Sequence, residues 1–411
     1  MLLPVATTLT ESPLRAWSVL GPVYLRLVDL SSTSFTPVQL SLLATTRLFV
    51  GPFEPAAIDT AVTWLDQGAH KAVFHTTYAA LLDGGIALDL PKDRVLLSIA
   101  LTDAEARDVA SLAMTLPALA SVTTGILLQP ASRMPFDALL TLRKALPEAF
   151  YFAVDGTASD VAPWHAQHIN LLATPASEDD VTAAFIACLR SDRSDGLYTT
   201  VVTDTSGVAL GLVYSSADSI AASVCQRRGI YYSRSRRGLW PKGDSSGHVQ
   251  ELVQLDMDCD SDALRFTVLQ HGPEKATTPD NGAFCHLETR TCWGAAGGVR
   301  HLQATLQDRK QSAPPGSYTK RLFDDMELLR NKLVEEAQEL AEATDPVHVA
   351  EEGADVLYFA MARCVAAGVS FQDVEHQLNL RARKLRRRPG NAKAYRIDAA
   401  NAILAKEPGA Q

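Results

Sequence analysis

Residues 258–292 read DCDSDALRFTVLQHGPEKATTPDNGAFCHLETRTC, a stretch that combines a strand-like pattern with two kinds of metal ligand. Three carboxylates alternate at its start, Asp258, Asp260 and Asp262, and Cys259 lies between the first two. In an extended segment these carboxylates would share one face, and Cys259 would point to the other. Carboxylate oxygens suit a hard ion, so this pattern predicts a Mg²⁺ site.

Two further thiols close the stretch, Cys285 and Cys292, and His286 follows the first. Together with Cys259 they form a sulfur set for Zn²⁺, with a fourth position left for water. The spacing therefore predicts two metals of different hardness. The same residues also fit three simpler interpretations: a solvated turn, a calcium loop, or a structural zinc site completed by His286 or His271.

The segments around this stretch predict a β-rich module. Alternating polar and apolar residues in YTTVVTD, GVALGLVYS, IYYSRSR, HVQELVQLDMD and LRFTVLQ favour strands, and residues 217–228 favour a short helix. Gly238, Gly243 and Gly247 indicate turns. The polar run at 191–196 is the expected boundary with the preceding domain.

Residues 20–190 alternate short apolar runs with amphipathic stretches, which predicts βα units and a parallel sheet. The expected strands begin at Tyr24, Arg47, Lys71, Arg94, Gly125, Phe150 and His168. The expected helices cover 55–68, 102–116, 134–146 and 177–190, and the second opens with a capping-box pattern, TDAE. We expect an α/β domain over 1–192 that is like a reduced βα barrel. His75 and Asp155 lie at strand ends, where such domains place their sites, but no further motif indicates a role.

The C-terminal part changes to helical periodicity. Residues 303–316 are polar and end in Pro-Pro-Gly, which predicts a linker over 299–316. Helices are expected in DDMELLRNKLVEEAQELAEAT and over 350–367 and 371–387. These segments predict an all-α domain over 317–396, and a tail follows over 397–411.

A second set of carboxylates lies on the first two of these helices. Glu336 and Glu339 are three residues apart and share a face, and Glu352 and Asp355 repeat that spacing. A helical hairpin would bring the two pairs together, and like charges so placed need water or a cation. The pattern predicts a second Mg²⁺ site, although a single ExxE on an exposed helix is common.

The motifs SRSRRGLWPKGDSSG, DCDSDAL, QHGP and CHLETRTC together resemble the phosphoribosyl-AMP cyclohydrolase family over about residues 197–298. The resemblance implies Mg²⁺ on Asp258, Asp260 and Asp262. It also implies Zn²⁺ on Cys259, Cys285 and Cys292, with Cys259 supplied across a homodimer interface. Zinc lowers the pKa of bound water, which suits attack on C6 of an adenine whose N1 carries a ribosyl group.

The same resemblance suggests how the substrate is held. Its phosphates need cationic and hydroxyl donors, and its base needs a stacking partner. The candidates are Ser233, Arg234, Ser235, Arg236 and Lys242 for phosphate, and Trp240 for the base. His286 is the candidate proton carrier, with His248 and His271 as alternatives. The chain departs from the family in a segment inserted after GP, PEKATTPDNGAF, and at Asp244, where the family more often has glutamate.

KLVEEAQEL and AEEGADVLY resemble the phosphoribosyl-ATP pyrophosphohydrolase family over about residues 317–396. The resemblance implies that Glu336, Glu339, Glu352 and Asp355 hold Mg²⁺, with Glu336 central to catalysis. Candidates for neutralising phosphate charge are Lys332, Arg383, Lys384 and Arg387. The order of the parts resembles the front of fungal multifunctional histidine-biosynthesis proteins. We therefore expect a bifunctional hydrolase that acts on phosphoribosyl-ATP and then on phosphoribosyl-AMP.

The composition of the chain argues against several classes of protein. The net charge of −9 argues against non-specific nucleic-acid binding, and no apolar run is long enough to span a membrane. Six cysteines in 411 residues are too sparse for a disulfide scaffold, so metal binding in the reducing cytoplasm is expected. Two rival hypotheses remain: a house-cleaning nucleoside-triphosphate pyrophosphatase with a structural zinc module, and a non-catalytic zinc scaffold.

Overall fold

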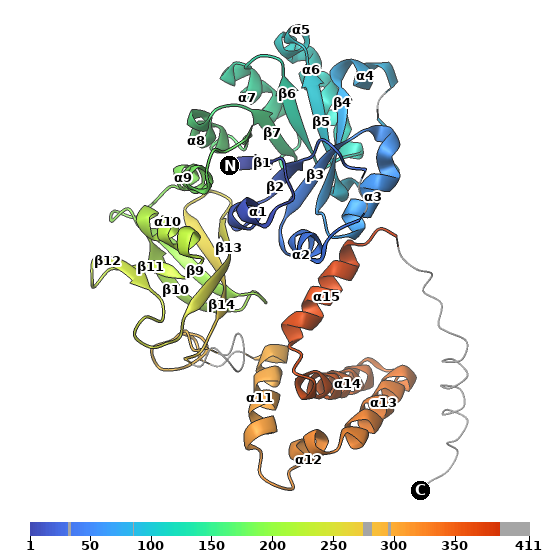
Figure 1. Ribbon diagram of the computed structural model, residues 1–411, viewed down its shortest axis with the longest axis vertical. Helices are drawn as coiled ribbons and strands as arrows, with labels where there is room; N and C mark the ends of the chain where they lie inside the picture. The colour runs from blue at the N-terminus through green and yellow to red at the C-terminus, as the bar shows by residue number, and fades with distance from the viewer. Residues whose placement is uncertain (32–33, 85, 274–281, 295–296, 387–411) are drawn as a thin grey trace.

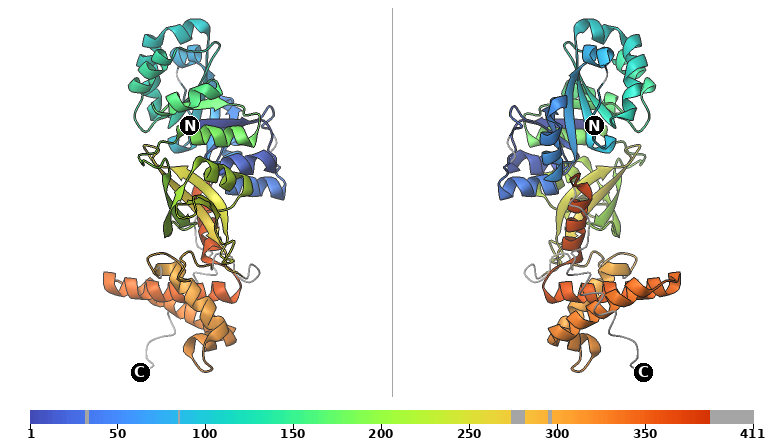
Figure 2. Two further views of the ribbon diagram at one scale, coloured as in Figure 1. Left: turned by 90° about the vertical axis from the view of Figure 1, so that its left-hand side faces the viewer. Right: turned by 90° about the vertical axis from the view of Figure 1, so that its right-hand side faces the viewer.

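The chain folds into three parts that follow one another along the long axis of the molecule (Figure 1, Figure 2). The computed structural model describes residues 1–31, 34–84, 86–273, 282–294 and 297–386. A βα barrel comes first, a β module lies in the middle, and a helical module lies at the far end. The fold class expected from the sequence is confirmed in all three parts.

The N-terminal part is a closed barrel of eight parallel strands in sequential order. The strands are β1 (Leu2–Ala6), β2 (Val23–Arg26), β3 (Leu48–Phe53), β4 (Lys71–Thr77), β5 (Val95–Leu101), β6 (Gly125–Pro130), β7 (Tyr151–Asp155) and β8 (Asn170–Ala173). Strand β1 pairs with both β2 and β8 and so closes the ring. The sequence prediction missed β1, because its five residues are all buried and show no alternation, and because Pro4 argues against a strand.

Helices surround the barrel on its outside (Figure 1). They are α1 (Glu11–Ser18), α2 (Pro37–Thr45), α3 (Ile58–Asp66), α4 (Tyr78–Gly84), α5 (Asp103–Arg107), α6 (Val109–Thr115), α7 (Phe136–Ala145), α8 (Val161–His165) and α9 (Glu178–Cys188). The predicted capping box is present, since Thr102 and Glu105 cap the start of α5 reciprocally. The single helix expected over 102–116 is divided, because Asp108 caps a new helix start.

The central module is a four-stranded mixed sheet in the order β10-β9-β14-β13, with a two-stranded hairpin beside it. Its elements are β9 (Tyr198–Asp204), β10 (Ala209–Ser215), α10 (Ala217–Gln226), β11 (Ile230–Ser233), β12 (Gly238–Pro241), β13 (Gln250–Met257) and β14 (Ala263–Gln270). Strands β9 and β14 run parallel, and the other pairs are antiparallel. Because β13 and β14 are antiparallel, the short segment 258–262 joins them, and it lies at the end of the sheet that faces the barrel (Figure 1).

The helical module contains α11 (Gly298–Ser312), α12 (Tyr318–Asp324), α13 (Met326–Glu342), α14 (Pro346–Ala366) and α15 (Phe371–Arg383). The linker expected over 299–316 is wrong, because most of it forms α11. Although α11 is polar, it buries Leu306 among Leu322, Leu329 and Phe359, and this tertiary contact stabilises the helix.

The end of α15 returns to the barrel (Figure 1). The Arg94 guanidinium donates to the Arg383 carbonyl, and the Leu385 amide donates to Asp66 Oδ1 at 2.6 Å. In the described part of the chain, no single helix is long and apolar enough to cross a membrane. Helices α14 and α15 pass that test only as a pair, and they are bent by 109° at their junction.

Candidate functional sites

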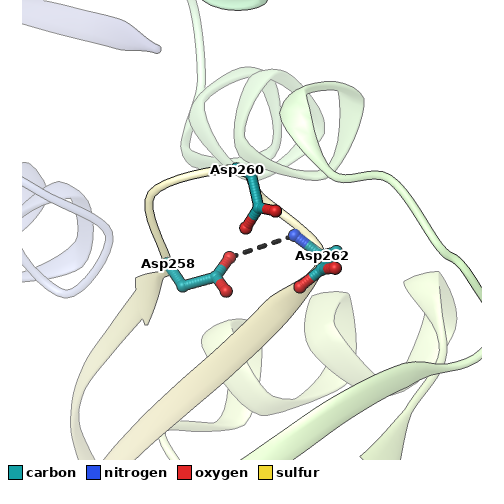
Figure 3. Close-up of side chains that lie close together, drawn as sticks. All are labelled: Asp258, Asp260 and Asp262. Atoms are coloured by element: carbon teal, nitrogen blue, oxygen red, sulfur yellow. Dashed lines mark hydrogen bonds between the residues drawn. The ribbon is translucent and has the colours of Figure 1, made fainter.

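The turn between β13 and β14 gathers the three aspartates of the first carboxylate cluster (Figure 3). Residues 258–262 turn sharply, with a φ of 67° at Ser261, and Asp258 accepts the Asp262 backbone amide at 3.0 Å. The carboxylate oxygens of Asp258, Asp260 and Asp262 consequently lie within 4.8 Å of one another. The extended segment that we expected is wrong, but the predicted convergence is present.

Residues that follow the barrel complete the surroundings of this turn. The Asp192 side chain, by hydrogen bonding and by adding negative charge, raises the pKa of Asp262 to about 6. The Arg190 amide donates to the Ser261 carbonyl at 2.9 Å, and the Arg190 guanidinium donates to the Asp260 carbonyl at 2.6 Å. Crowded carboxylates of this kind are stabilised by a cation.

Two of the three predicted zinc thiols lie together at the opposite end of the sheet. Cys285 and Cys292 are within hydrogen-bonding reach of each other, and the Cys292 amide donates to the Leu210 carbonyl of β10 at 2.8 Å. The Leu287 backbone amide lowers the pKa of Cys285, which favours the thiolate that binds metal. Among the described residues of a single chain, Cys259 does not gather with these two thiols.

Lys242 is the cation that faces the paired thiols. Burial lowers the pKa of this ammonium, and the charges of Cys292 and Cys285 oppose that shift. Its Nζ also lies 5.3 Å from the ring centroid of Phe284. Lys242 is therefore placed to favour thiolates at this end of the sheet, away from the exposed phosphate candidates.

Each of the three candidate histidines has a distinct environment. His286 is exposed, and its Nδ1 lies 3.8 Å from Cys285 Sγ. His248 Nδ1 accepts the Ala283 amide at 3.0 Å, and so positions the backbone just before the first thiol. His271 instead lies 3.6 Å from a carboxylate oxygen of Glu251.

An open cavity of about 600 Å³ lies beside the hairpin β11–β12. Its lining includes four of the six predicted substrate residues, Ser233, Arg234, Ser235 and Trp240. The Arg234 guanidinium lies 4.2 Å from the ring centroid of Tyr214, which orients it over the cavity. Cationic, hydroxyl and aromatic groups converge here, as binding of a nucleotide phosphate and base requires.

The second carboxylate cluster lies between α13 and α14. Oxygens of Glu336, Glu352 and Asp355 are within 4.8 Å of one another, and Glu336 is buried. Glu339 lies beside them, since burial and the charges of Glu336 and Glu352 raise its pKa. The hairpin predicted from the spacing of the acidic residues is thus present.

The environment of this cluster fits a cation. Lys332 Nζ lies 2.7 Å from one oxygen of Glu336, and His348 Nε2 lies 3.0 Å from one oxygen of Glu352. The other Glu352 oxygen is buried, and no described residue hydrogen-bonds to it. A buried carboxylate oxygen without a donor is costly, and a metal ion would satisfy it.

Comparisons with known proteins match both modules. The model of phosphoribosyl-AMP cyclohydrolase matches residues 211–294, and that of phosphoribosyl-ATP pyrophosphohydrolase matches residues 299–382. The histidine biosynthesis bifunctional protein HisIE of Thermus thermophilus is 32% identical over 207 residues, which cover 47% of this chain and 92% of that protein. The chain belongs to the HisIE family. The resemblance seen in the sequence is therefore confirmed.

Fungal relatives of this HisIE chain are longer. The bifunctional protein his7 of Schizosaccharomyces pombe is 52% identical over 203 residues, 49% of this chain and 46% of that protein. The trifunctional protein of Kluyveromyces lactis is 47% identical over 237 residues, 57% of this chain and 28% of that protein. The chain thus spans between about a quarter and a half of the length of these relatives.

Some candidate residues of this HisIE chain make contacts other than the expected ones, and others lie outside the residues that the structure describes. The Arg383 carbonyl accepts a hydrogen bond from the Arg94 guanidinium of the barrel, and the expected role of the Arg383 side chain beside phosphate stays a prediction. Asp244 pairs with Arg228, and the Arg236 amide donates to Ser233 Oγ. Residues 274–281 of the inserted segment, Arg387 and the tail over 397–411 lie outside the described residues.

Sequence reasoning missed three residues that contact the HisIE candidate sites: Tyr214, Asp192 and His165, whose Nε2 lies 2.8 Å from the Ser261 hydroxyl in the aspartate turn. The alternation in β10 could have revealed Tyr214, since Leu212 and Tyr214 share the outward face of that strand. No local pattern relates Asp192 or His165 to the aspartate turn, because both reach it only through folding.

Proposed function

We propose that this chain catalyses two successive hydrolyses. The helical module converts phosphoribosyl-ATP to phosphoribosyl-AMP and pyrophosphate, and the central module then opens the adenine ring. The observation that carries the proposal is the presence of two converging carboxylate clusters, one in each module that matches a family model. The chemistry of the two modules is ordered, because the product of the first is the substrate of the second.

For the first reaction we assign Mg²⁺ to Glu336, Glu352 and Asp355, with Glu339 at the edge of the set. When bound, this ion would neutralise phosphate charge and activate water. The buried Glu352 oxygen, which has no hydrogen-bond donor among the described residues, supports the assignment. Lys332 Nζ lies 2.7 Å from a Glu336 oxygen and offsets part of the negative charge of the cluster.

For the second reaction, the residues around the 600 Å³ cavity hold the substrate. Arg234, Ser233 and Ser235 bind phosphate, and Trp240 stacks on the base. Water adds at C6 as the N1–C6 bond breaks, and N1 gains a proton, which we assign to exposed His286. Zn²⁺ on Cys259, Cys285 and Cys292 would lower the pKa of water, while Mg²⁺ would occupy the aspartate turn.

The separation of the thiols supports a homodimer. Cys259 is exposed beside the aspartate turn, whereas Cys285 and Cys292 lie at the far end of the sheet. We infer that Cys259 completes the zinc site of a second copy. The two paired thiols and Lys242 form the half of the site within each chain.

The test is to incubate the purified chain with phosphoribosyl-ATP and to follow pyrophosphate release and ring-opening absorbance. A zinc-selective chelator should stop ring opening and leave pyrophosphate release intact. Absence of bound zinc in active protein would overturn the zinc assignment. Equal rates with ordinary nucleoside triphosphates would favour the house-cleaning pyrophosphatase, and absence of both reactions would favour the scaffold.

A further inference from the structure

The interior of the barrel changes character near the carboxyl ends of its strands. Most of the interior is a buried cluster formed by Leu3, Val5, Tyr24, Phe49, Val73, Leu96, Leu127, Ala153 and Leu172. Inward side chains recur at every second residue of a strand. The next inward positions toward the carboxyl ends are Arg26, Gly51, His75, Ser98, Gln129 and Asp155. An apolar floor is therefore covered by a layer in which every side chain is polar.

The strand register places members of this polar layer side by side. His75 of β4 is the register partner of Ser98 of β5, and Arg26 of β2 is the partner of Gly51 of β3. Gly51 contributes no side chain to this layer, because Val73 of β4 already fills the space that a Cβ would need. Four consecutive strands from β4 to β7, together with β2 across the ring, thus surround one polar mouth.

The fold uses few of these polar side chains. Within the part of the chain that the structure describes, no hydrogen bond or ion pair involves the side chains of His75, Ser98 or Gln129. The Arg26 guanidinium interacts electrostatically with the Tyr24 hydroxyl and with the Asp155 carboxyl. Below them, the Tyr24 hydroxyl is fully buried and has no partner with hydrogen-bond geometry. The Arg26 guanidinium lies 5.4 Å from the centroid of the same ring. Buried polar groups are nearly always paired, so this orphan hydroxyl points to a ligand.

The amino ends of the same strands show the contrast. Lys71 donates to the Asp93 carbonyl at 2.6 Å and to Thr124 Oγ1 at 2.7 Å. Arg94 donates to the carbonyls of His70 and Ala69, each at 2.8 Å. Lys71 and Arg94 are therefore engaged by neighbouring carbonyls and by Thr124, whereas His75 and Gln129 at the carboxyl end have no hydrogen-bond partner among the described residues.

We propose that the carboxyl-end mouth of the barrel binds a small hydroxylated oxyanion. Arg26 and His75 hold the anionic group, while Asp155 and Gln129 accept hydrogen bonds from hydroxyls of the ligand. Barrels of this architecture place their sites at this end. The site lies outside both matched regions, 211–294 and 299–382, and does not depend on the hydrolase assignment.

Calorimetric titration of the full chain tests the proposal with ribose 5-phosphate, malate and uncharged ribose. Every protein in this titration also carries the substitution Arg234→Met, which removes the cation of the cavity beside the hairpin β11–β12. Ribose 5-phosphate or malate should bind and ribose should not, and the two anions distinguish a phosphate from a carboxylate ligand. Arg26→Met should weaken binding at least about tenfold, equivalent to about 1.4 kcal/mol. Arg107→Met, an exposed arginine on the same barrel, should leave it unchanged.

A second variant guards against misfolding. Tyr24→Phe removes only the orphan hydroxyl, so the barrel should fold normally by circular dichroism while affinity for the anion falls severalfold. Failure of both anions to bind would overturn the proposal. Equal affinity in Arg26→Met and Arg107→Met, or in Tyr24→Phe and the parent, would also overturn it.

Discussion

The imidazole Nε2 of His165, at the end of α8, lies 2.8 Å from the Ser261 hydroxyl in the aspartate turn. Ser261 is only 4% exposed and adopts a positive φ, so the conformation of the turn depends on its contacts. Arg190 adds backbone contacts from just after α9. The barrel thus holds the turn that brings the three carboxylates together, and acts as a support for the neighbouring site.

His165→Ala should loosen this turn without removing a ligand. Loss of a partner from a buried hydroxyl costs about 1–3 kcal/mol. We expect the Mg²⁺ concentration for half-maximal ring opening to rise roughly fivefold or more, with pyrophosphate release unchanged. Exposed His301, changed to alanine, is the control. An unchanged Mg²⁺ dependence in His165→Ala would show that the barrel does not position the turn.

Cys285→Ser should abolish ring opening and leave pyrophosphate release intact, because the two sites lie in separate modules. The measurement is pyrophosphate release beside ring-opening absorbance, with bound zinc determined by elemental analysis. Cys225→Ser changes an exposed thiol on α10 and should retain both activities and the zinc. Loss of both activities in Cys285→Ser, with the fold intact, would contradict independent sites.

The double change Glu336→Gln and Glu339→Gln should have the opposite effect. Removing two carboxylates from the cluster should lower pyrophosphate release by at least about 100-fold, more than loss of an outer partner of a metal ligand costs. Ring opening of supplied phosphoribosyl-AMP should persist. Glu351→Gln, an exposed neighbour on α14, should behave as the parent. Normal pyrophosphate release in the double variant would refute the Mg²⁺ assignment.

His70 should make the folded chain sensitive to mild acid. Burial, aided by the charges of Arg383, Arg47 and Arg94, lowers the pKa of His70 from 6.5 to about 3. Between these two values the unfolded chain binds a proton that the folded chain does not. Stability should therefore fall as the pH falls below about 6.5.

The measurement is the melting temperature at pH 7 and at pH 5. The parent should lose a few degrees more than His70→Gln, in which this titration is absent. His301→Gln, at an exposed position, should follow the parent. Equal losses in the parent and in His70→Gln would exclude His70 as the acid-sensitive group.

Parts of the fold were predictable where one local signal sufficed. The βα rhythm after Tyr24 and the capping box at Thr102 follow from neighbouring residues alone. Strand β1 was not predictable, because a fully buried strand lacks alternation. Helix α11 was also missed, because its stability comes from the burial of Leu306 against distant helices and not from its own polar residues.

The candidate sites also have features that the local sequence predicts and features that depend on tertiary contacts. The chemical identity of each carboxylate and thiol cluster is local, and the spacing of Glu336, Glu352 and Asp355 on two helices predicted their convergence. The aspartates were expected to meet along a strand, but they meet in a turn. Its shape depends on Asp258 accepting a backbone amide and on contacts from outside the module.

The amino-acid sequence by itself determined the three-part architecture and the kinds of ligand available, because periodicity and side-chain chemistry are properties of short segments. Only the tertiary structure decided which groups meet. It separates Cys259 from Cys285 and Cys292, and it holds the aspartate turn against the barrel through His165. It also places Arg26, His75 and Asp155 near the carboxyl ends of strands in one barrel. Such contacts join residues far apart in the chain, and only closure of the barrel and packing of the modules bring them within reach.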